Sequence, residues 1–386
     1  MSLKNCVFAA ISVTLGIVAG LCIIGAIFFV DLRLSEASRQ DVDQSSPIVR
    51  YLFKTRIGRY LLTDQAFVRL MGAIKETPDD TFSTAWDFNE GIALSKRMFI
   101  PTKMFGFDKY KYRPNIGIYN CRAWSGLMFW KVAVAASSDV TKLLKDVDAD
   151  CIYFETDENG FKKTEFPTKR DGFNNIFFLG DSFTEGLWVA PAFTFVNAFG
   201  RKLASRGISV TPINLGVNGY SALEEDWMLE KYGDFFNPIV VFANLYPNDV
   251  DEDVEKAVVG RDIPEQSYEN MFYYLGRMEE YCLRRNVPLI VTVIPIKEQF
   301  STLRDFSAFQ SHVKSWSEGR QVTFLDSREY FSLFGADKIY LSWDPHFSNE
   351  GHEHYADFLI ANTASILSGA VAHAHSVEGK TTVEPQ

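Results

Sequence analysis

The sequence predicts an α/β domain whose parallel sheet is covered on both faces, preceded by one N-terminal transmembrane helix. Three observations carry this prediction. Short apolar runs alternate with helix-like segments from about residue 151, polar side chains follow several of these runs, and a long uncharged stretch lies near the N-terminus. Strands buried on both faces read as continuous apolar runs, and their alternation with helices is typical of parallel sheets.

The regular part of the chain contains five expected strands and four expected helices. The strands are expected at Ile176–Leu179, Pro212–Gly216, Ile239–Leu245, Leu289–Ile296 and Thr323–Leu325. The helices are expected at Phe193–Ala204, Leu223–Tyr232, Ser267–Arg285 and Gly351–Leu367. Ligands of such sheets bind beyond the carboxyl ends of the strands, so the strand-end loops are where a site is expected.

The N-terminal stretch 6–30 contains no charged residue. About 25 residues form a helix of roughly 37 Å, which exceeds the roughly 30 Å hydrocarbon thickness of a bilayer. A cleaved signal peptide has a shorter apolar stretch that ends in small residues, whereas this one runs into Phe28-Phe29-Val30-Asp31. A lipoprotein signal does not fit either, because Leu21 precedes Cys22. The stretch is therefore predicted to be an uncleaved anchor.

The remaining divisions follow changes in composition. They are a short flank (1–5), a polar stalk (31–47), a partly helical accessory region (48–150), the α/β domain (151–367) and a small, polar, disordered tail (368–386). Residues 48–61 form a basic amphipathic stretch, either a solvated helix face or a surface for anionic lipid. The apolar segment 123–138 is too short to span a membrane and is expected to be a buried helix rather than a docking surface.

Composition excludes several classes of protein. The chain has 39 Lys and Arg against 49 Asp and Glu, a net charge of −10, which argues against a nucleic-acid partner. The mean hydropathy of −0.07 excludes a polytopic membrane protein but not a single anchor. Outside the anchor, Cys121, Cys151 and Cys282 allow at most one disulfide and are expected to be buried thiols. No metal-binding spacing or phosphate-binding loop is present, so no metal or cofactor is expected.

Four separate strand-end loops each carry a group suited to acyl transfer. Ser182 follows the first strand, Gly219 the second and Asn248 the third, while Asp344 and His346 precede the last helix. A serine hydroxyl becomes a nucleophile beside a histidine base that a third group orients, and the tetrahedral intermediate needs donors for its oxyanion. Backbone N–H groups of Ser182 and Gly219 and the Asn248 amide are the candidate donors.

Four of these residues also have a structural interpretation. Ser182 and Asp344 could cap the helices that follow them, Gly219 could be a turn glycine, and Asn248 could hold its own loop in an Asx turn. Four such coincidences at successive loops are less expected than one shared site.

Gly180-Asp181-Ser182-Phe183, Gly219, Asn248-Asp249 and Asp344-Pro345-His346 resemble the four motif blocks of the SGNH, or GDSL-type, hydrolases. The resemblance implies a three-layer α/β/α, flavodoxin-like domain that cleaves or transfers acyl esters. It implies Ser182 as nucleophile, His346 as base and Asp344 as its orienting partner. The backbone N–H groups of Ser182 and Gly219 and the side-chain amide of Asn248 would form the oxyanion hole.

Two features depart from the commonest family pattern. Tyr246 stands where glycine usually precedes the asparagine block, and the last block is Asp-x-His rather than Asp-x-x-His. The shorter block is similar to the alginate O-acetylation branch, and 157–161 is similar to membrane-anchored bacterial members. His352 and His354 are alternative candidates for the base.

The resemblance implies a single-pass membrane protein whose periplasmic domain is a serine esterase or O-acyltransferase, with acetyl as the expected acyl group. The expected substrate is a carbohydrate ester of the cell envelope, with Tyr246, Trp188 and Trp227 as candidate substrate contacts. Expected partners are the lipid bilayer and a membrane-bound O-acyltransferase or another membrane complex. The alternative is a catalytically silent SGNH-like subunit that serves a membrane complex as a structural or interaction component.

Overall fold

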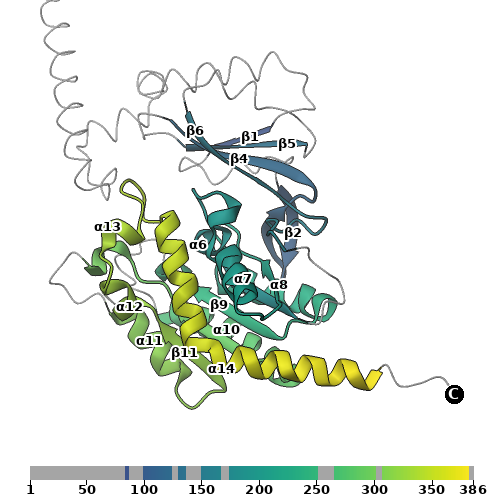
Figure 1. Cartoon of the computed structure of the whole chain (residues 1–386). Helices are drawn as coiled ribbons and strands as arrows, with labels where there is room; N and C mark the ends of the chain where they lie inside the picture. The colour runs from purple at the N-terminus through teal and green to yellow at the C-terminus, as the bar shows by residue number, and fades with distance from the viewer. Residues whose placement is uncertain are drawn as a thin grey trace, which may run out of the picture. The chain divides into compact units, whose positions relative to one another are not determined.

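The computed structural model describes residues 83–86, 99–123, 129–135, 149–166, 174–250, 265–300 and 307–381 (Figure 1). The predicted anchor, the stalk and the basic stretch 48–61 lie outside these residues. Contacts divide the chain into two compact units, of which the second comprises Asp64–Leu341 with Pro345–Gln386. The second unit contains every sheet and helix described below.

The centre of the second unit is a sheet of five parallel strands. They are β7 (Asn175–Gly180), β8 (Thr211–Asn214), β9 (Val240–Leu245), β10 (Leu289–Val293) and β11 (Val322–Asp326). Their order is β11-β10-β9-β7-β8, so the direction of winding reverses between β7 and β9. Such a reversal opens a crevice at the carboxyl ends of the two strands. The predicted parallel sheet is confirmed.

Helices cover both faces of this sheet (Figure 1). The long ones are α7 (Phe195–Ser205), α8 (Ala222–Phe236), α10 (Glu265–Arg285) and α14 (Asn349–Thr381). Phe178 packs edge-on against Phe199 of α7, with ring centroids 5.1 Å apart. Its neighbour Phe177 packs against Phe236 of α8 at 6.2 Å. Successive strand residues point to opposite faces, so these contacts place α7 and α8 in different layers. The predicted three-layer arrangement is confirmed.

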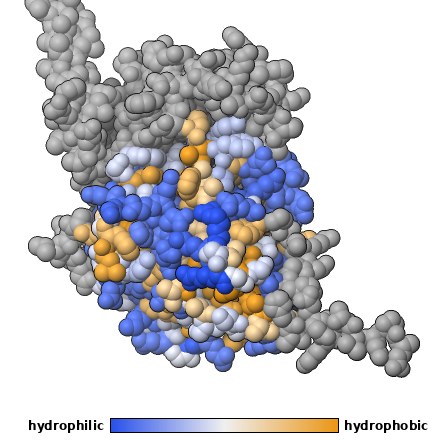
Figure 2. All heavy atoms as spheres, in the orientation of Figure 1, coloured by the Kyte–Doolittle hydropathy of each residue, from blue (hydrophilic) through white to orange (hydrophobic). Residues whose placement is uncertain are grey.

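Shorter helices line the strand-end loops and the β11 edge. They are α6 (Ser182–Glu185), η1 (Pro191–Phe193), η2 (Pro247–Asp249), η3 (Lys297–Phe300), α11 (Ala308–Ser317), α12 (Arg328–Ser332) and α13 (Ala336–Ile339). On the face shown in Figure 2, hydrophilic residues cover most of the described surface, and hydrophobic residues form patches among them.

The accessory region is built of strands wherever the structure describes it. An antiparallel sheet has the order β1-β5-β4-β6, and β2 and β3 form a separate hairpin. The strands are β1 (Ser83–Trp86), β2 (Phe99–Met104), β3 (Phe107–Tyr112), β4 (Ile116–Ala123), β5 (Phe129–Ala135) and β6 (Ala149–Glu155). β6 crosses the boundary predicted at residue 150.

The prediction of a buried helix within 123–138 is wrong, because β5 occupies its centre. β5 contains Trp130, Val132 and Val134 on alternate positions, and β-branched and aromatic residues favour strands. It also pairs with β1 on one side and β4 on the other, so its backbone groups are satisfied by neighbouring strands. The description of the whole region 48–150 as partly helical stays a prediction, because much of it lies outside the described residues.

The last helix runs further than the sequence suggests. A disordered tail was expected from Ser368, but α14 continues to Thr381. Alanines at 370, 372 and 374 are strong helix formers, and a polar, small-residue composition alone does not end a helix. By length and composition Asn349–Ala374 is long and apolar enough to cross a membrane, and 39% of its most apolar window is buried inside the protein.

Cys151 departs from the expectation of buried thiols, and Cys282 meets it. Cys151 is disulfide-bonded, and the pairing of β4 with β6 sets Cys121 opposite it. Cys282 is free and buried, and burial raises the pKa of its thiol to about 12. Sequence spacing does not reveal strand register, which is why the pairing was not predicted.

Candidate active site

Ser182 stands at the turn between β7 and α6. Gly180 ends β7 with a φ of +151°, where a Cβ atom would lie 2.1 Å from the Thr184 Oγ1 atom, so this sharp turn requires glycine. Asp181 then caps α6, because its Oδ1 atom accepts a hydrogen bond from the Phe183 N–H at 2.8 Å. The cap is therefore Asp181 and not Ser182, which lies in the first turn and is 5% exposed.

His346 lies beside this serine. Its Nε2 atom is 2.7 Å from the Ser182 Oγ atom, across 164 residues of sequence. A bridge between Tyr340 and Phe347, with a 2.9 Å hydrogen bond from the Leu341 N–H to the His346 carbonyl, closes the loop that carries the histidine. The His346 ring packs against Phe183, with centroids 4.7 Å apart. The loop and this ring contact together orient the imidazole.

Asp344 lies in the same loop, two residues before His346. Asp344 was also considered as a cap for the last helix. The structure places Ser348 at the start of α14, where its Oγ atom accepts the capping hydrogen bond from the Gly351 N–H at 3.0 Å.

Asp181 also contacts Asn248, which lies in η2 after β9. The Asn248 Nδ2 atom donates to Asp181 Oδ2 at 3.1 Å, and the Ser182 Oγ atom lies 3.5 Å from the same oxygen. An asparagine amide has two N–H groups, so one remains for a ligand. Burial raises the pKa of Asp181, while the Phe183 N–H, His346 and Asn248 act in the opposite direction.

Gly219 lies in a turn after β8. The Tyr220 N–H donates to the Val217 carbonyl at 3.0 Å, and Gly219 is exposed with a φ of +79°. The turn is tied to α6, because the Asn218 N–H donates to Glu185 Oε2 at 2.7 Å. The loop after β8 and the helix that carries Ser182 are therefore held together.

Three residues that sequence reasoning missed surround this connection. Glu185 is fully buried and accepts a hydrogen bond from the Tyr112 hydroxyl of β3 at 3.0 Å. Burial is the main cause that raises the pKa of Tyr112, followed by the charge of Glu185. Tyr110, also on β3, donates through its hydroxyl to the Asn218 carbonyl at 2.8 Å. No motif marks these tyrosines, because they come from the accessory region, which has no clear period.

A buried pair of carboxyl groups adjoins Asn248. Both carboxyl oxygens of Glu225, and Oδ1 of Asp249, make no hydrogen bond within the described part of the chain. Asp249 Oδ2 accepts from the Tyr246 N–H at 2.9 Å. Burial, and then the charge of Asp249, raises the pKa of Glu225 well above its usual value. The pair therefore favours holding a proton.

The three candidate substrate contacts have different surroundings. Tyr246 is 6% exposed, and its ring packs on Phe183 with centroids 4.4 Å apart. Trp227 of α8 packs edge-on against Tyr232 at 6.2 Å. Trp188 is half-buried in the turn after α6, with a left-handed φ of +68°. The packing of Tyr246 and Trp227 accounts for their size without a ligand.

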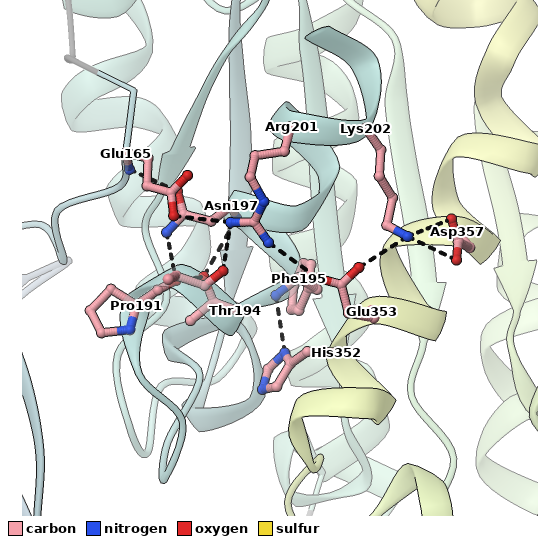
Figure 3. A network of polar contacts seen from close by, with 11 residues as sticks. Glu165, Pro191, Thr194, Phe195, Asn197, Arg201, Lys202, His352, Glu353 and Asp357 are labelled. Atoms are coloured by element: carbon pink, nitrogen blue, oxygen red, sulfur yellow. Dashed lines mark hydrogen bonds and ion pairs between the residues drawn. The ribbon is translucent and has the colours of Figure 1, made fainter. Parts of the chain in front are cut away.

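The alternative histidines make other contacts. The His352 Nδ1 atom accepts the N–H of Phe195, the first residue of α7, at 3.1 Å (Figure 3). Burial lowers the pKa of His352 to about 3, so this imidazole is neutral. The His354 ring stacks on Phe334 with centroids 3.7 Å apart, and its Nε2 atom lies 3.6 Å from Glu350 Oε1.

A polar network joins α7 to the start of α14 (Figure 3). Arg201 contacts Glu165 at 3.0 Å and Glu353 at 3.1 Å, and Lys202 contacts Glu353 and Asp357 at 3.0 Å each. Because α14 begins three residues after His346, this network fixes the helix that follows the histidine loop. Among the described residues, no group of three or more His, Cys, Asp or Glu side chains could hold a metal ion.

The fold and this geometry define an α/β protein with a serine–histidine pair at the carboxyl edge of its parallel sheet. Residues 178–354 match the model of the GDSL-like Lipase/Acylhydrolase family. The α/β domain is therefore similar to this family over the matched residues. No curated protein matches the chain with significant similarity.

Several solved structures are similar over about half of this chain. TesA has a TM-score of 0.42 and 13% identity, and the match covers 50% of this chain and 99% of TesA. A lipase/acylhydrolase from Enterococcus faecalis has a TM-score of 0.39 and 18% identity, with 49% and 95% covered. A family 3 carbohydrate esterase from Clostridium thermocellum has a TM-score of 0.39 and 18% identity, with 51% and 98% covered.

Proposed function

We propose that this protein is a membrane-anchored serine esterase or O-acyltransferase that acts on acyl esters, with acetyl as the favoured acyl group. The observation that carries the proposal is the 2.7 Å contact between Ser182 Oγ and His346 Nε2. This distance lies within the hydrogen-bond reach that a general base needs.

In the proposed first step, the Ser182 oxygen attacks the acyl carbonyl and His346 takes the hydroxyl proton. Asp344 orients the imidazole and stabilises its charge. The negative charge of the tetrahedral intermediate is stabilised by the N–H groups of Ser182 and Gly219 and by the second N–H of Asn248. When the intermediate collapses, His346 gives its proton to the departing alcohol, and the acyl group stays on Ser182.

In the second step, His346 removes a proton from water or from a sugar hydroxyl, whose oxygen attacks the acyl-serine. Collapse of the second intermediate returns the proton to Ser182 and releases an acid or a new ester. Water as acceptor makes the protein an esterase, and a carbohydrate hydroxyl makes it a transferase. In this proposal the substrate is a carbohydrate of the cell envelope. A membrane-bound O-acyltransferase is the partner that supplies the acyl group.

The anchor 6–30 would attach the domain to the bilayer, with the domain on the periplasmic side. The disulfide at Cys151 supports this orientation, because disulfides persist in oxidising compartments and are rare in the cytosol.

The test uses the full-length protein with a chromogenic acetyl ester and a serine-reactive fluorophosphonate. We expect turnover and labelling in the wild type, and the loss of both in Ser182→Ala. The matched control is Ser332→Ala, because Ser332 is an exposed serine of α12 whose hydroxyl donates to the Glu329 carbonyl of the same helix at 2.6 Å. Absence of labelling in the wild type, or equal labelling of Ser182→Ala, would instead favour the catalytically silent subunit of a membrane complex.

A further inference from the structure

The turn that carries Gly219 is of type II. Its first and last residues, Val217 and Tyr220, are joined by a 3.0 Å backbone hydrogen bond. Gly219 has a φ of +79°, whereas Asn218 is not among the non-glycine residues with positive φ. A negative φ followed by a positive φ at the two central positions defines type II.

A type II turn can convert to a type I turn by a local change in the backbone. Types I and II differ chiefly in the orientation of the peptide between the two central residues, which is the Asn218–Gly219 peptide here. Glycine adopts either sign of φ with little steric cost, so Gly219 itself does not choose between them. The orientation of this peptide has to be set by contacts from outside the turn.

Tyr110 makes such a contact. Its hydroxyl donates to the Asn218 carbonyl at 2.8 Å. In a trans peptide the C=O and the N–H point in opposite directions, and the described chain contains no cis peptide. The bond that holds the Asn218 carbonyl therefore also directs the Gly219 N–H away from Tyr110.

The hairpin is held to the turn in return. The Tyr220 hydroxyl donates to the Tyr110 carbonyl at 2.6 Å, and the Tyr110 ring packs edge-on against Phe99 of β2 at 4.8 Å. The preceding peptide is held as well, because the Asn218 N–H donates to Glu185 Oε2. These contacts cross 108 and 110 residues of sequence, so the β2–β3 hairpin is part of the support of this loop.

We propose that Tyr110 is a positioning residue that holds the Asn218–Gly219 peptide so that the Gly219 N–H serves as an oxyanion donor. The inference rests on the proposed acyl chemistry for the role of that N–H. The accessory hairpin would then be required for catalysis without touching the substrate.

The test is Tyr110→Phe in the full-length protein, which keeps the ring and removes the hydroxyl. Loss of one oxyanion donor costs about 100- to 1,000-fold in kcat, and partial loss of its orientation should cost about 10- to 100-fold. We expect this loss in kcat, with KM changed less than about twofold. Phosphonylation of Ser182 should slow by a similar factor, since its transition state also develops charge on oxygen.

Two matched controls separate positioning from packing. Tyr220→Phe removes the other hydroxyl bond between hairpin and turn but leaves the Asn218 carbonyl bonded, so its loss in kcat should be much smaller. Tyr281→Phe removes a hydroxyl that donates to Asp234 at 2.8 Å, between α10 and α8, and should leave kcat unchanged. Equal losses in Tyr110→Phe and Tyr220→Phe, or a loss confined to KM, would overturn the proposal.

A second measurement does not depend on activity. Deuterium exchange of the backbone segment 216–220 should be faster in Tyr110→Phe than in the wild type and in Tyr281→Phe. If the wild type has no esterase activity, the proposed function fails, and the exchange experiment still tests the hairpin. Unchanged exchange in a Tyr110→Phe protein of normal melting temperature would show that Tyr110 does not hold the turn.

Discussion

The Asp181 carboxylate accepts a hydrogen bond from the Asn248 side chain at 3.1 Å. Asp181 precedes the candidate nucleophile at the end of β7, and Asn248 follows β9, the next strand in the sheet. The two loops at the point where the winding reverses are therefore linked by one charge-assisted contact, which leaves an N–H of Asn248 for the proposed oxyanion.

The first prediction concerns this contact. Asp181→Asn keeps an oxygen to cap α6 but sets an amide NH₂ against the NH₂ of Asn248. We expect kcat/KM to fall by about tenfold or more, because a small misplacement of the Asn248 amide is enough to slow the reaction. The melting temperature should change little, because the cap of α6 is kept. The control is Asp326→Asn, since Asp326 is the last residue of β11 and likewise accepts the N–H two residues on, at 2.9 Å. Equal activities of the two variants would contradict the role of Asp181.

The second prediction concerns His352 and acid. Burial lowers the pKa of His352 from 6.5 to about 3 in the folded protein. As the pH falls from about 6.5 to about 3, the unfolded chain binds a proton that the folded protein does not, so the free energy of unfolding falls. The difference amounts to about 4–5 kcal/mol at about 1.4 kcal/mol for each pH unit.

Denaturant unfolding from pH 7 to pH 4 measures this slope. His352→Asn retains an oxygen that can accept the Phe195 N–H and has no titrating ring, so its slope should be shallower. His312→Asn, at an exposed position of α11, is the control and should keep the wild-type slope. A wild-type slope in His352→Asn would show that other groups cause the acid sensitivity.

The third prediction concerns Glu225. Its pKa is raised in the folded protein by burial and by Asp249, so the unfolded chain loses its proton first as the pH rises. Wild-type stability therefore decreases above the ordinary glutamate pKa. Glu225→Gln removes the charge and can donate to the unpaired Asp249 Oδ1 atom, so we expect a gain of about 1–3 kcal/mol at pH 8.

Thermal or denaturant unfolding at pH 5 and pH 8 tests this gain, which should be larger at pH 8. The control is Glu280→Gln, since Glu280 is an exposed residue of α10 paired with Arg284 and should contribute less than about 1 kcal/mol. A variant less stable than the wild type at pH 8 would mean that the Glu225 charge is compensated.

The fourth prediction concerns the disulfide at Cys151. The strand register makes Cys121 the expected partner. Cys121→Ser and Cys151→Ser should each lower the free energy of unfolding by about 2–4 kcal/mol, and the double variant should lose no more than either one. A reductant should lower the melting temperature of the wild type and of Cys282→Ala, but not that of the double variant. Additive losses in the double variant would rule out the pairing.

Much of the α/β domain could be predicted from the sequence. Its strands are apolar runs buried on both faces, so their identity is local information, and the polar residues at their ends are visible in order along the chain. The resemblance of the four motif blocks to a known family selected Ser182, Gly219, Asn248, Asp344 and His346 as candidates before any distance was known.

The accessory region could not be predicted in this way. Its strands β4 and β5 are stabilised by pairing with neighbours, and an apolar segment such as Phe129–Ala135 is compatible with a strand or a buried helix until a partner strand is known. The disulfide at Cys151 could not be predicted for the same reason, because the register of paired strands determines which cysteines face each other.

The residues at the strand ends, and the parallel sheet that brings those ends together, could be predicted from the sequence. The folded chain was needed to show that Ser182 and His346 lie 2.7 Å apart, that His352 is a neutral partner of α7, and that Tyr110 donates to the Asn218 carbonyl. The two kinds of feature differ in how far apart the interacting residues lie along the chain. Burial patterns and turn glycines depend on a few neighbouring residues, whereas the orientation of one peptide or one imidazole depends on side chains more than a hundred residues away.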